Sequence, residues 1–347
     1  MTEETHVPSA ESPRPSSVDT STSYMGLRLR HPFMAGASPL SAHLDGVRRL
    51  EDAGAAAIVL HSLFEEQITE AQSGRIRGMA SDDPQFVARL AAFPPSAAYP
   101  FAPDEHLEHL RRVKAAVRVP VIASLNGTTA EAWLKHAYPL QEAGADALEV
   151  NFYEVVTDFS VPAAAIERQI LSAVVELKQL LRIPVSVKLS PFFTAFGNVA
   201  HRLDEAGADG LVIFNRFYQP DIDIATMTAS PSLELSRSPE LLLRLRWLAI
   251  LHGRIRPSLA VTGGVETWND GVKAILAGAH VVQIVSALLR HGPAFLTTMV
   301  EKLVVWMEWS KVSSVEEMRG RVSLKTAADP GDFERANYIR ALHRWER

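Results

Sequence analysis

The chain of 347 residues contains no cysteine. This absence excludes disulfides, thiolate nucleophiles and cysteine-ligated zinc or iron–sulfur clusters within the chain. No uninterrupted apolar run reaches about 18 residues, so no membrane span is expected. The 35 lysines and arginines are mixed with 40 aspartates and glutamates, and no basic run indicates a nucleic-acid or anionic-membrane surface. This composition fits a cytoplasmic enzyme.

The first 23 residues are rich in serine, threonine, proline and glutamate and contain no apolar run. Such a segment cannot be a signal-peptide core or a membrane anchor, and it predicts a disordered tail over residues 1–23. Residues 24–347 are expected to form one domain. Within it, residues 62–103 hold five prolines, and a stretch of this length is typical of a functional lid or binding loop.

Short apolar strands alternate with helical patterns along this domain. Four Ala-Gly-Ala turns each end a helix immediately before an apolar strand, where glycine can adopt the left-handed conformation. The turns lie at residues 53–55, 143–145, 206–208 and 277–279. They precede the second, fourth, sixth and eighth predicted strands, which favours eight repeating units. The prediction is an α/β fold, a (β/α)8 TIM barrel; a doubly wound open sheet is the alternative, although no GxGxxG turn follows the first strand.

The segment from Pro257 to Leu288 predicts the last two strands of this barrel. Gly263 and Gly264 follow the seventh strand, and Ser286 ends the eighth. In such barrels the loops after these strands often form a phosphate site, and glycines let backbone N–H groups approach an anion. The segment therefore predicts a phosphate-bearing cofactor or substrate, unless the glycines serve only the turn itself.

The predicted strand ends carry an unusual number of amide side chains. Asn126, Asn151 and Asn215 end the third, fourth and sixth strands, and Lys188 lies near the end of the fifth. Asparagine offers a donor and an acceptor without charge. The carboxyl end of the predicted barrel, here called its mouth, therefore suits a heterocycle with carbonyl and N–H edges better than a metal ion. The alternative for each asparagine is that it only caps its turn.

Lys188 is flanked by apolar residues in its strand. An unpaired buried lysine is costly, so an inward side chain needs a negative partner, which could be a Schiff-base substrate, a phosphate or a reduced flavin. Alternatively, Lys188 emerges at the top of the barrel and only closes a salt bridge, with Glu149 as one candidate partner.

Several segments resemble the FMN-dependent dihydroorotate dehydrogenases, namely ADALEVN, IPVSVKLSP, ADGLVIFN, LAVTGGVETWNDGVKAILAGAHVVQI and the early PFMAGASPLS. The resemblance covers roughly residues 24–324 and implies a barrel that binds FMN. It implies that Lys188 lies near the N1/O2 edge of the flavin and that Asn151 and Asn215 contact the substrate. The positions that it implies for the cofactor are Ala35, Gly36, Ser62, Asn126, Asn151, Lys188, Ser238, Gly263, Gly264, Val285 and Ser286.

The chain departs from the family pattern after the fourth strand. The family carries a cysteine or serine base there, whereas this chain has Glu154, and the second asparagine of the motif is absent. The family's lysine after the second strand is replaced by His61 and Ser62. A carboxylate can act as a base, so Glu154 is the candidate; alternatively, it is a surface residue in a chain with another substrate.

The resemblance therefore predicts an enzyme of pyrimidine biosynthesis that oxidises dihydroorotate, or a related cyclic amide, by hydride transfer to FMN. The alternatives are a phosphate-binding barrel lyase or aldolase that uses Lys188 as a Schiff base, and a non-catalytic flavin-binding subunit. Without cysteine, an iron–sulfur relay must belong to a separate electron-acceptor subunit; a homodimer is the other assembly expected. The polar tail argues against the quinone-using membrane class and favours a cytoplasmic location.

Overall fold

The computed structural model of the chain describes residues 18–65, 103–127, 130–216, 219–231 and 234–345. Most of the predicted tail (residues 1–23) and of the lid-like stretch (residues 62–103) lies outside the described residues. The described chain begins six residues before residue 24, the expected start of the domain. Asp19 is fixed there by main-chain hydrogen bonds with Ser313 (2.8 Å) and Val315 (2.9 Å).

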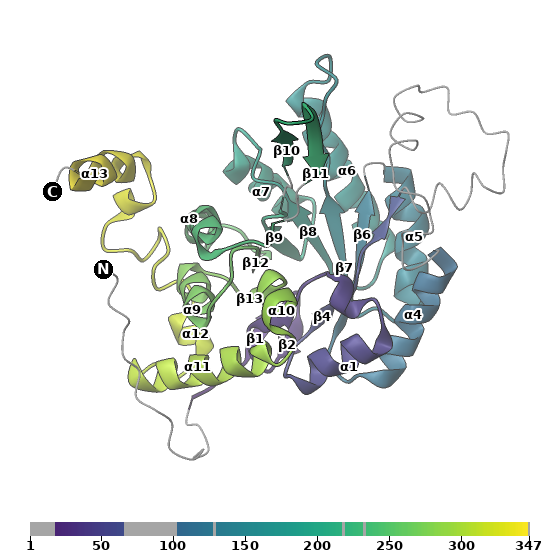
Figure 1. Cartoon of the computed structure of the whole chain (residues 1–347), viewed down its shortest axis with the longest axis horizontal. Coiled ribbons are helices and arrows are strands. Elements are labelled where there is room, and N and C mark those ends of the chain that lie inside the picture. Colours follow the sequence, from purple (N-terminus) through teal and green to yellow (C-terminus); the bar gives the residue numbers. More distant parts are fainter. Residues whose placement is uncertain (1–17, 66–102, 128–129, 217–218, 232–233, 346–347) are drawn as a thin grey trace.

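Eight parallel strands in the described chain close into a barrel (Figure 1). They are β3 (Phe33–Ala35), β4 (Ile58–Val59), β6 (Val121–Gly127), β7 (Ala147–Phe152), β8 (Val185–Leu189), β9 (Gly210–Ile213), β12 (Ser258–Thr262) and β13 (Val281–Ile284). The ring closes because β13 pairs with β3 and β4 pairs with β6. A short additional strand, β5 (Leu63–Phe64), pairs with the carboxyl end of β6. This arrangement confirms the predicted (β/α)8 TIM barrel.

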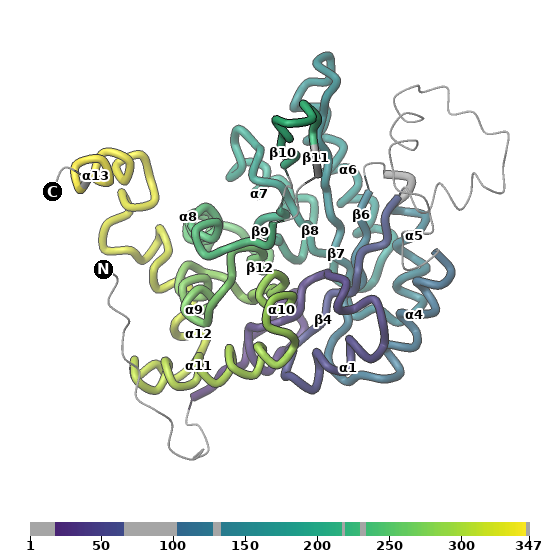
Figure 2. Tube along the Cα trace, in the orientation of Figure 1, coloured from purple at the N-terminus to yellow at the C-terminus, as the bar shows by residue number. Residues whose placement is uncertain are grey.

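Helices between the strands surround the ring (Figure 1). They are α1 (Leu44–Asp52), α4 (Pro103–Ala116), α5 (Ala130–Glu142), α6 (Ala163–Leu180), α7 (Phe196–Glu205), α8 (Leu241–Leu251), α9 (Trp268–Ala277) and α11 (Phe295–Trp309). A short helix, α10 (Ser286–His291), precedes α11, and α12 (Val315–Met318) and α13 (Arg335–Trp345) follow it. The helix α13 stands apart from the barrel (Figure 2).

An antiparallel hairpin of β1 (Thr22–Tyr24) and β2 (Leu27–Leu29) closes the amino-terminal end of the barrel. The Met25 N–H donates to the Ser258 hydroxyl at the start of β12 (3.1 Å). Tyr24 and Met25 form a buried cluster with residues on, or directly before, seven of the eight strands of the ring. Those residues are Met34, Ala57, Val59, Ile122, Ala147, Val212, Ala260 and Val281. The barrel interior is therefore a packed core below its carboxyl end.

A second hairpin lies between β9 and α8. Its strands are β10 (Pro220–Asp223) and β11 (Thr228–Pro231), and it projects beyond the ends of β8 and β9 (Figure 2). All four described residues of β10 are exposed, so this hairpin lacks the alternation of buried and exposed residues by which a sequence reveals a strand.

The buried His31 and the partly buried His280 each hydrogen-bond to the main chain of a barrel strand in a neutral form. His31 Nδ1 accepts from the Phe33 N–H (3.2 Å), and its Nε2 lies 2.8 Å from the Gly54 carbonyl oxygen. His280 Nδ1 accepts from the Leu259 N–H (3.0 Å). Because Nδ1 accepts in both rings, protonation of that atom removes a main-chain hydrogen bond. Burial lowers the pKa of His31 from 6.5 to about 4 and that of His280 to about 3.

We expect the protein to lose stability as the pH falls below 6.5. In that range the unfolded chain binds protons at these positions that the folded chain does not bind, so stability declines with decreasing pH. The loss is roughly 1.4 kcal/mol per histidine and pH unit, until the folded pKa is reached. Urea unfolding at a series of pH values measures it. His31→Gln should flatten the profile, whereas the same change at the exposed His201 should not, and a parent profile without slope in this range contradicts the expectation.

Candidate active site at the barrel mouth

Three of the predicted site residues lie at one level of the barrel wall. The strand register places Asn126 of β6 opposite Asn151 of β7, and Asn151 opposite Lys188 of β8. Their neighbours along each strand pack outward into the helix layer, so these three side chains point inward. The Asn215 amide, just after β9, donates to the Asn151 side-chain oxygen at 2.7 Å. The structure therefore brings the three predicted asparagines and the lysine together at the carboxyl end of the barrel.

Lys188 has a buried negative partner inside the barrel. Its Nζ lies 3.3 Å from Glu149 Oε1, and the side chains are 9% and 1% exposed. The other Glu149 oxygen accepts from the Gln283 amide at 2.6 Å. Gln283 is fully buried, and its own side-chain oxygen has no hydrogen-bond partner among the described residues. Because both side chains are buried, each needs the other as its partner, and this contact fixes the position of the lysine.

A layer of hydroxyl groups lies below this level. Ser124 and Ser186 are opposite Glu149 in the strand register, and the Ser62 hydroxyl lies 2.7 Å from that of Ser124. Ser62 is thus close to the strands of the site, but its hydroxyl is already hydrogen-bonded one level below Asn126. The predicted contact of Ser62 with a cofactor stays a prediction.

The predicted glycine turn follows β12 and stands over a buried arginine. Gly263 and Gly264 have φ angles of +80° and +78°. The Arg244 guanidinium is buried beneath Gly263, and its hydrogen bonds go to the carbonyl oxygens of Thr262 (2.5 Å), Glu240 (2.7 Å) and Phe214 (3.3 Å). Burial lowers the pKa of Arg244 to about 10, so it stays charged at neutral pH. A buried cation below backbone N–H groups favours an anion at this turn.

The sequence did not single out Arg244. It lies in the apolar helix α8, and an arginine at a buried helical position was the available signal. Such a residue must find acceptors inside the protein, but the sequence alone does not say which.

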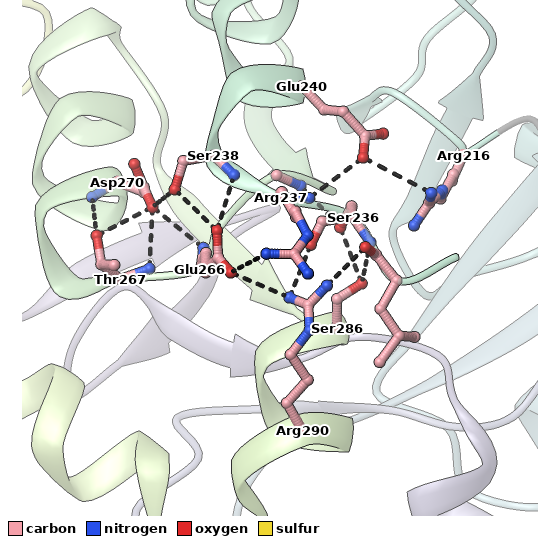
Figure 3. Close-up of polar contacts among 12 residues, drawn as sticks. Arg216, Ser236, Arg237, Ser238, Glu240, Glu266, Thr267, Asp270, Ser286 and Arg290 are labelled. Carbon is pink, nitrogen blue, oxygen red and sulfur yellow. Dashed lines mark hydrogen bonds and ion pairs between the residues drawn. The ribbon is translucent and has the colours of Figure 1, made fainter. Parts of the chain in front are cut away.

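Two serines connect the turn with the end of β13 (Figure 3). The Gly264 N–H donates to the Ser236 hydroxyl (3.0 Å), and the Ser236 N–H donates to the Ser286 hydroxyl (3.0 Å). The Arg290 guanidinium fixes this segment through the carbonyl oxygens of Ser236 (2.9 Å) and Leu235 (2.6 Å). Predicted phosphate-site residues from two separate loops are therefore adjacent.

Ser238 lies beside the same turn, with acidic neighbours. Its N–H donates to Glu266 (3.2 Å), and its hydroxyl donates to Asp270 (2.7 Å). Glu266 in turn pairs with Arg290 at 3.5 Å (Figure 3). The Ser238 N–H thus already has an acceptor within the protein, and its predicted contact with a phosphate stays a prediction.

A side chain at position 264 has no space. A Cβ added to Gly264 lies 2.5 Å from the main-chain N of Leu241, and the φ of +78° disfavours any residue but glycine. We expect Gly264→Ala to lower the free energy of unfolding by at least about 1–3 kcal/mol and to impair phosphate binding. Gly197→Ala is the matched control, because a Cβ there meets nothing within 4 Å. Urea unfolding measures the first effect, and the cofactor content of the purified protein measures the second. If the Gly264→Ala protein equals the parent in both, the phosphate site is not at this turn.

Ala35 and Gly36, the predicted cofactor contacts at the first strand, pack closely against the end of β13. Ala35 ends β3, and the Gly36 N–H donates to the Ile284 carbonyl oxygen (3.1 Å). A Cβ added to Gly36 lies 2.7 Å from a methyl group of Val285. Position 36 therefore requires glycine because a side chain would collide with Val285, whether or not a cofactor is bound there.

Glu154 lies on the loop that follows β7, beyond the level of Asn126, Asn151 and Lys188. It follows β7 by two residues, is partly exposed, and lines a cavity of about 730 Å³ beside the mouth. Gly127, Phe152 and Ser190, at the carboxyl ends of β6, β7 and β8, line the same cavity. Glu154 is therefore adjacent to the strands that carry Asn126, Asn151 and Lys188, although none of these three side chains is among the residues that line its cavity.

The residues at the mouth fit a flavin mononucleotide. Uncharged amides and the charged Lys188 suit the edges of a heterocycle, and Gln283 offers an acceptor without a partner. The glycine turn above Arg244 suits a single phosphate. Within the described chain, no group of three or more histidine, aspartate or glutamate side chains could hold a metal ion.

A parallel barrel with a polar, partly charged mouth at the carboxyl ends of its strands defines a (β/α)8-barrel enzyme. Residues 102–307, more than half of the chain, match the family model described as dihydroorotate dehydrogenase. The chain belongs to the dihydroorotate dehydrogenase family, whose members are oxidoreductases.

Individual relatives differ in their names and in how much of the chain they match. A protein of Aeropyrum pernix assigned as dihydroorotate dehydrogenase A (fumarate) is 33% identical over 55% of this chain and 64% of its own length. The catalytic subunit of dihydroorotate dehydrogenase B (NAD(+)) of Thermoplasma volcanium is 26% identical over 87% of this chain and 98% of its own. Subunit PreA of the NAD-dependent dihydropyrimidine dehydrogenase of Escherichia coli is 24% identical, covering 87% and 76%.

In the parts of the chain that the structure describes, no helix has both the length and the apolar character needed to cross a membrane.

Proposed function

We propose that this protein is an FMN-dependent dehydrogenase that oxidises a CH–CH bond in dihydroorotate or a related cyclic amide. The observation that carries the proposal is the level formed by Asn126, Asn151 and Lys188, with Asn215 hydrogen-bonded to Asn151. Neutral donors and acceptors beside a single fixed cation suit a flavin and a cyclic amide more than a sugar or a metal complex.

Bound FMN supplies hydride acceptance, and the chain positions the reactants. Gly263, Gly264 and Ser286 would hold the phosphate, with the Arg244 charge beneath the turn favouring an anion. Lys188 would face the flavin edge, where a fixed positive charge stabilises developing negative charge. Asn151 would orient the amide edges of the substrate together with Asn215.

Glu154 is the proposed base. A carboxylate on the loop after β7 can accept a proton from a substrate carbon if the substrate reaches the cavity that Glu154 lines. The serine or cysteine of the family pattern is replaced here, and Glu154 would take the place of that base.

The names of the relatives support a separate electron-acceptor subunit. The Thermoplasma and Escherichia coli proteins are described as subunits of NAD-dependent enzymes. This chain has no cysteine, so a thiolate-ligated iron–sulfur relay would have to come from a partner. A homodimer of this chain is the other assembly consistent with the proposal.

The contact between Lys188 and Glu149 speaks against the lyase alternative. A Schiff base requires an amine that is free to attack a carbonyl carbon, whereas the Lys188 amine is engaged by a buried carboxylate at 3.3 Å.

The test is the visible spectrum of the purified protein. We expect a yellow protein that releases FMN, and not FAD, on denaturation, because the mouth offers one phosphate site. Anaerobic mixing with dihydroorotate and, separately, with 5,6-dihydrouracil should bleach the flavin with at least one of them. A colourless protein that takes up no added FMN contradicts the proposal.

A further inference from the structure

Two charged side chains beside the glycine turn have no part in the function proposed above. Arg290 lies on α10, one turn after Ser286, and Glu266 follows Gly264 by two residues. Their side chains are 20% and 26% exposed, and Arg290 Nη1 lies 3.5 Å from Glu266 Oε1 (Figure 3). Each of them therefore extends from one of the two chain segments that form the proposed phosphate site.

Arg290 is held in place by the main chain. Its Nη1 donates to the Ser236 carbonyl oxygen at 2.9 Å, and its Nη2 donates to the Leu235 carbonyl oxygen at 2.6 Å. These two bonds use two of the five guanidinium N–H groups. The contact with Glu266, at 3.5 Å, is longer than the roughly 2.7–2.9 Å of a strong charged hydrogen bond. Arg290 can therefore exchange Glu266 for another anion and keep the contacts that position it.

Glu266 binds donors that an external anion could also use. Its Oε2 accepts from the Ser238 N–H at 3.2 Å and from the Ser238 hydroxyl at 3.4 Å, and Arg237 Nη1 lies 3.9 Å from its Oε1. The Ser238 hydroxyl has a shorter contact, of 2.7 Å, with Asp270. Because each of its contacts is long, the Glu266 carboxylate contributes little to fixing this loop. Its main effect is to offset the charge of the two neighbouring arginines.

The hydroxyl groups of Ser236 and Ser286 offer a donor next to Arg290. They lie 2.8 Å apart, and each accepts a main-chain N–H at 3.0 Å, from Gly264 and from Ser236 respectively. Two hydroxyl groups carry two protons, and the contact between them uses one. The second proton has no acceptor among the residues that the structure describes. An anion bound by it would lie beside Ser236, whose carbonyl oxygen Arg290 already holds.

We propose that Arg290 binds the phosphate group held at the glycine turn and that Glu266 competes with this phosphate for Arg290. For FMN the inference rests on the proposed function and deepens it, because it names the side chains that set how tightly the cofactor is held. A phosphate monoester carries about 1.5 to 2 negative charges at neutral pH, against one for a carboxylate, so it is the stronger partner of the arginine. Glu266 then repels the bound phosphate as a like charge and weakens its binding.

Glu266→Gln tests the competition on the full-length protein. Glutamine keeps the shape and a hydrogen-bond acceptor but removes the charge, so FMN should bind about three- to tenfold more tightly, as expected for a partly exposed charge pair. The recovery of flavin fluorescence on dilution of the purified protein measures the dissociation constant. Riboflavin, which lacks the phosphate, is measured after exchange for FMN and should bind as it does to the parent.

Arg290→Gln tests the other half of the proposal. FMN should bind at least about tenfold more weakly, the usual effect of losing a hydrogen bond to a charged group, and riboflavin should be unaffected. Urea unfolding shows whether each variant is folded. Glu266→Gln leaves Arg290 and its carbonyl contacts in place, so it decides the question even where Arg290→Gln does not fold.

Glu317→Gln is the matched control. Glu317 Oε2 accepts from the Ser313 N–H and hydroxyl, at 2.7 Å each, and its Oε1 pairs with Arg321 at 2.5 Å. These contacts resemble those of Glu266. However, Glu317 lies on α12, which is hydrogen-bonded to Asp19 beside the hairpin at the amino-terminal end of the barrel. The change should therefore alter the affinity for neither flavin.

Three results each overturn the proposal: Glu266→Gln binds FMN no more tightly than the parent, Arg290→Gln binds FMN as tightly as the parent, or riboflavin responds to these changes as strongly as FMN. Inorganic phosphate repeats the test without a flavin. At constant ionic strength it should raise the urea midpoint more in Glu266→Gln than in the parent, and less in Arg290→Gln.

The two ligands separate this inference from the proposed function. A yellow protein whose affinity for FMN ignores both changes loses only the competition between Glu266 and the phosphate. A protein that takes up no FMN but shows the expected response to inorganic phosphate keeps that competition and loses the dehydrogenase assignment.

Discussion

Replacing Lys188 with alanine should slow flavin reduction by about a hundred- to a thousand-fold, the usual effect of losing one fixed electrostatic group. Lys188 is inside the barrel and is held by Glu149 at 3.3 Å, so its charge is already in place before the reaction. Lys188→Arg should not restore the rate, because a planar guanidinium does not fit a site shaped around an ammonium group. Stopped-flow absorbance of the bound flavin measures the rate in each variant.

The same substitution leaves the Glu149 carboxylate buried without its cation, which typically costs about 3–5 kcal/mol of stability. A paired variant, Lys188→Met with Glu149→Gln, removes both charges and should regain most of that loss. Flavin reduction should stay slow in the paired variant if Lys188 acts on the flavin. A rate like that of the parent in either variant would remove Lys188 from the mechanism.

The repeating turns explain why the barrel could be predicted. Gly54, Gly144, Gly207 and Gly278 all have positive φ angles, of 101°, 100°, 90° and 125°, which is the conformation that the Ala-Gly-Ala pattern indicated. The strands that follow these glycines are buried on both faces. A buried parallel strand reads as a continuous apolar run, so both the turns and the strands left a clear local pattern.

The same reasoning fails where a contact depends on distant parts of the chain. The partner of Lys188 is 39 residues away, and Gln283 reaches the same carboxylate from 134 residues away. Their proximity follows from the strand register and the closure of the ring, neither of which is encoded locally. The sequence could therefore place Lys188 in a buried strand, but it left Glu149 as only one of several possible partners.

Loop positions were the least predictable part of the site. The sequence placed Glu154 after the fourth strand of the barrel, on the side where the chemistry occurs. Whether it faces the barrel axis or the helix layer depends on how residues 152–156 pack against residues 190–194, and both segments line the cavity. Side chains from two separate loops decide this packing, and no periodic pattern constrains it.

Glu154→Gln should leave FMN binding unchanged and slow flavin reduction by about a hundred- to ten-thousand-fold, the range typical of a lost general base. In the parent the rate should rise with pH as a carboxyl group loses its proton and then level off, and the variant should lack this rise. Stopped-flow bleaching with dihydroorotate and with a neutral cyclic amide measures both. Glu167→Gln is the matched control, because Glu167 lines the same cavity but is already paired with Arg202.

The size of the effect decides which group takes the proton. A decrease in the reduction rate below about tenfold is too small for a general base. Glu154 would then be only a residue that lines the cavity. Tyr153, which also lines the cavity, and the pair His61 and Ser62 then become the candidates. A large loss with the neutral amide, combined with little reaction of dihydroorotate in the parent, would assign the base to Glu154 and make a neutral cyclic amide the substrate.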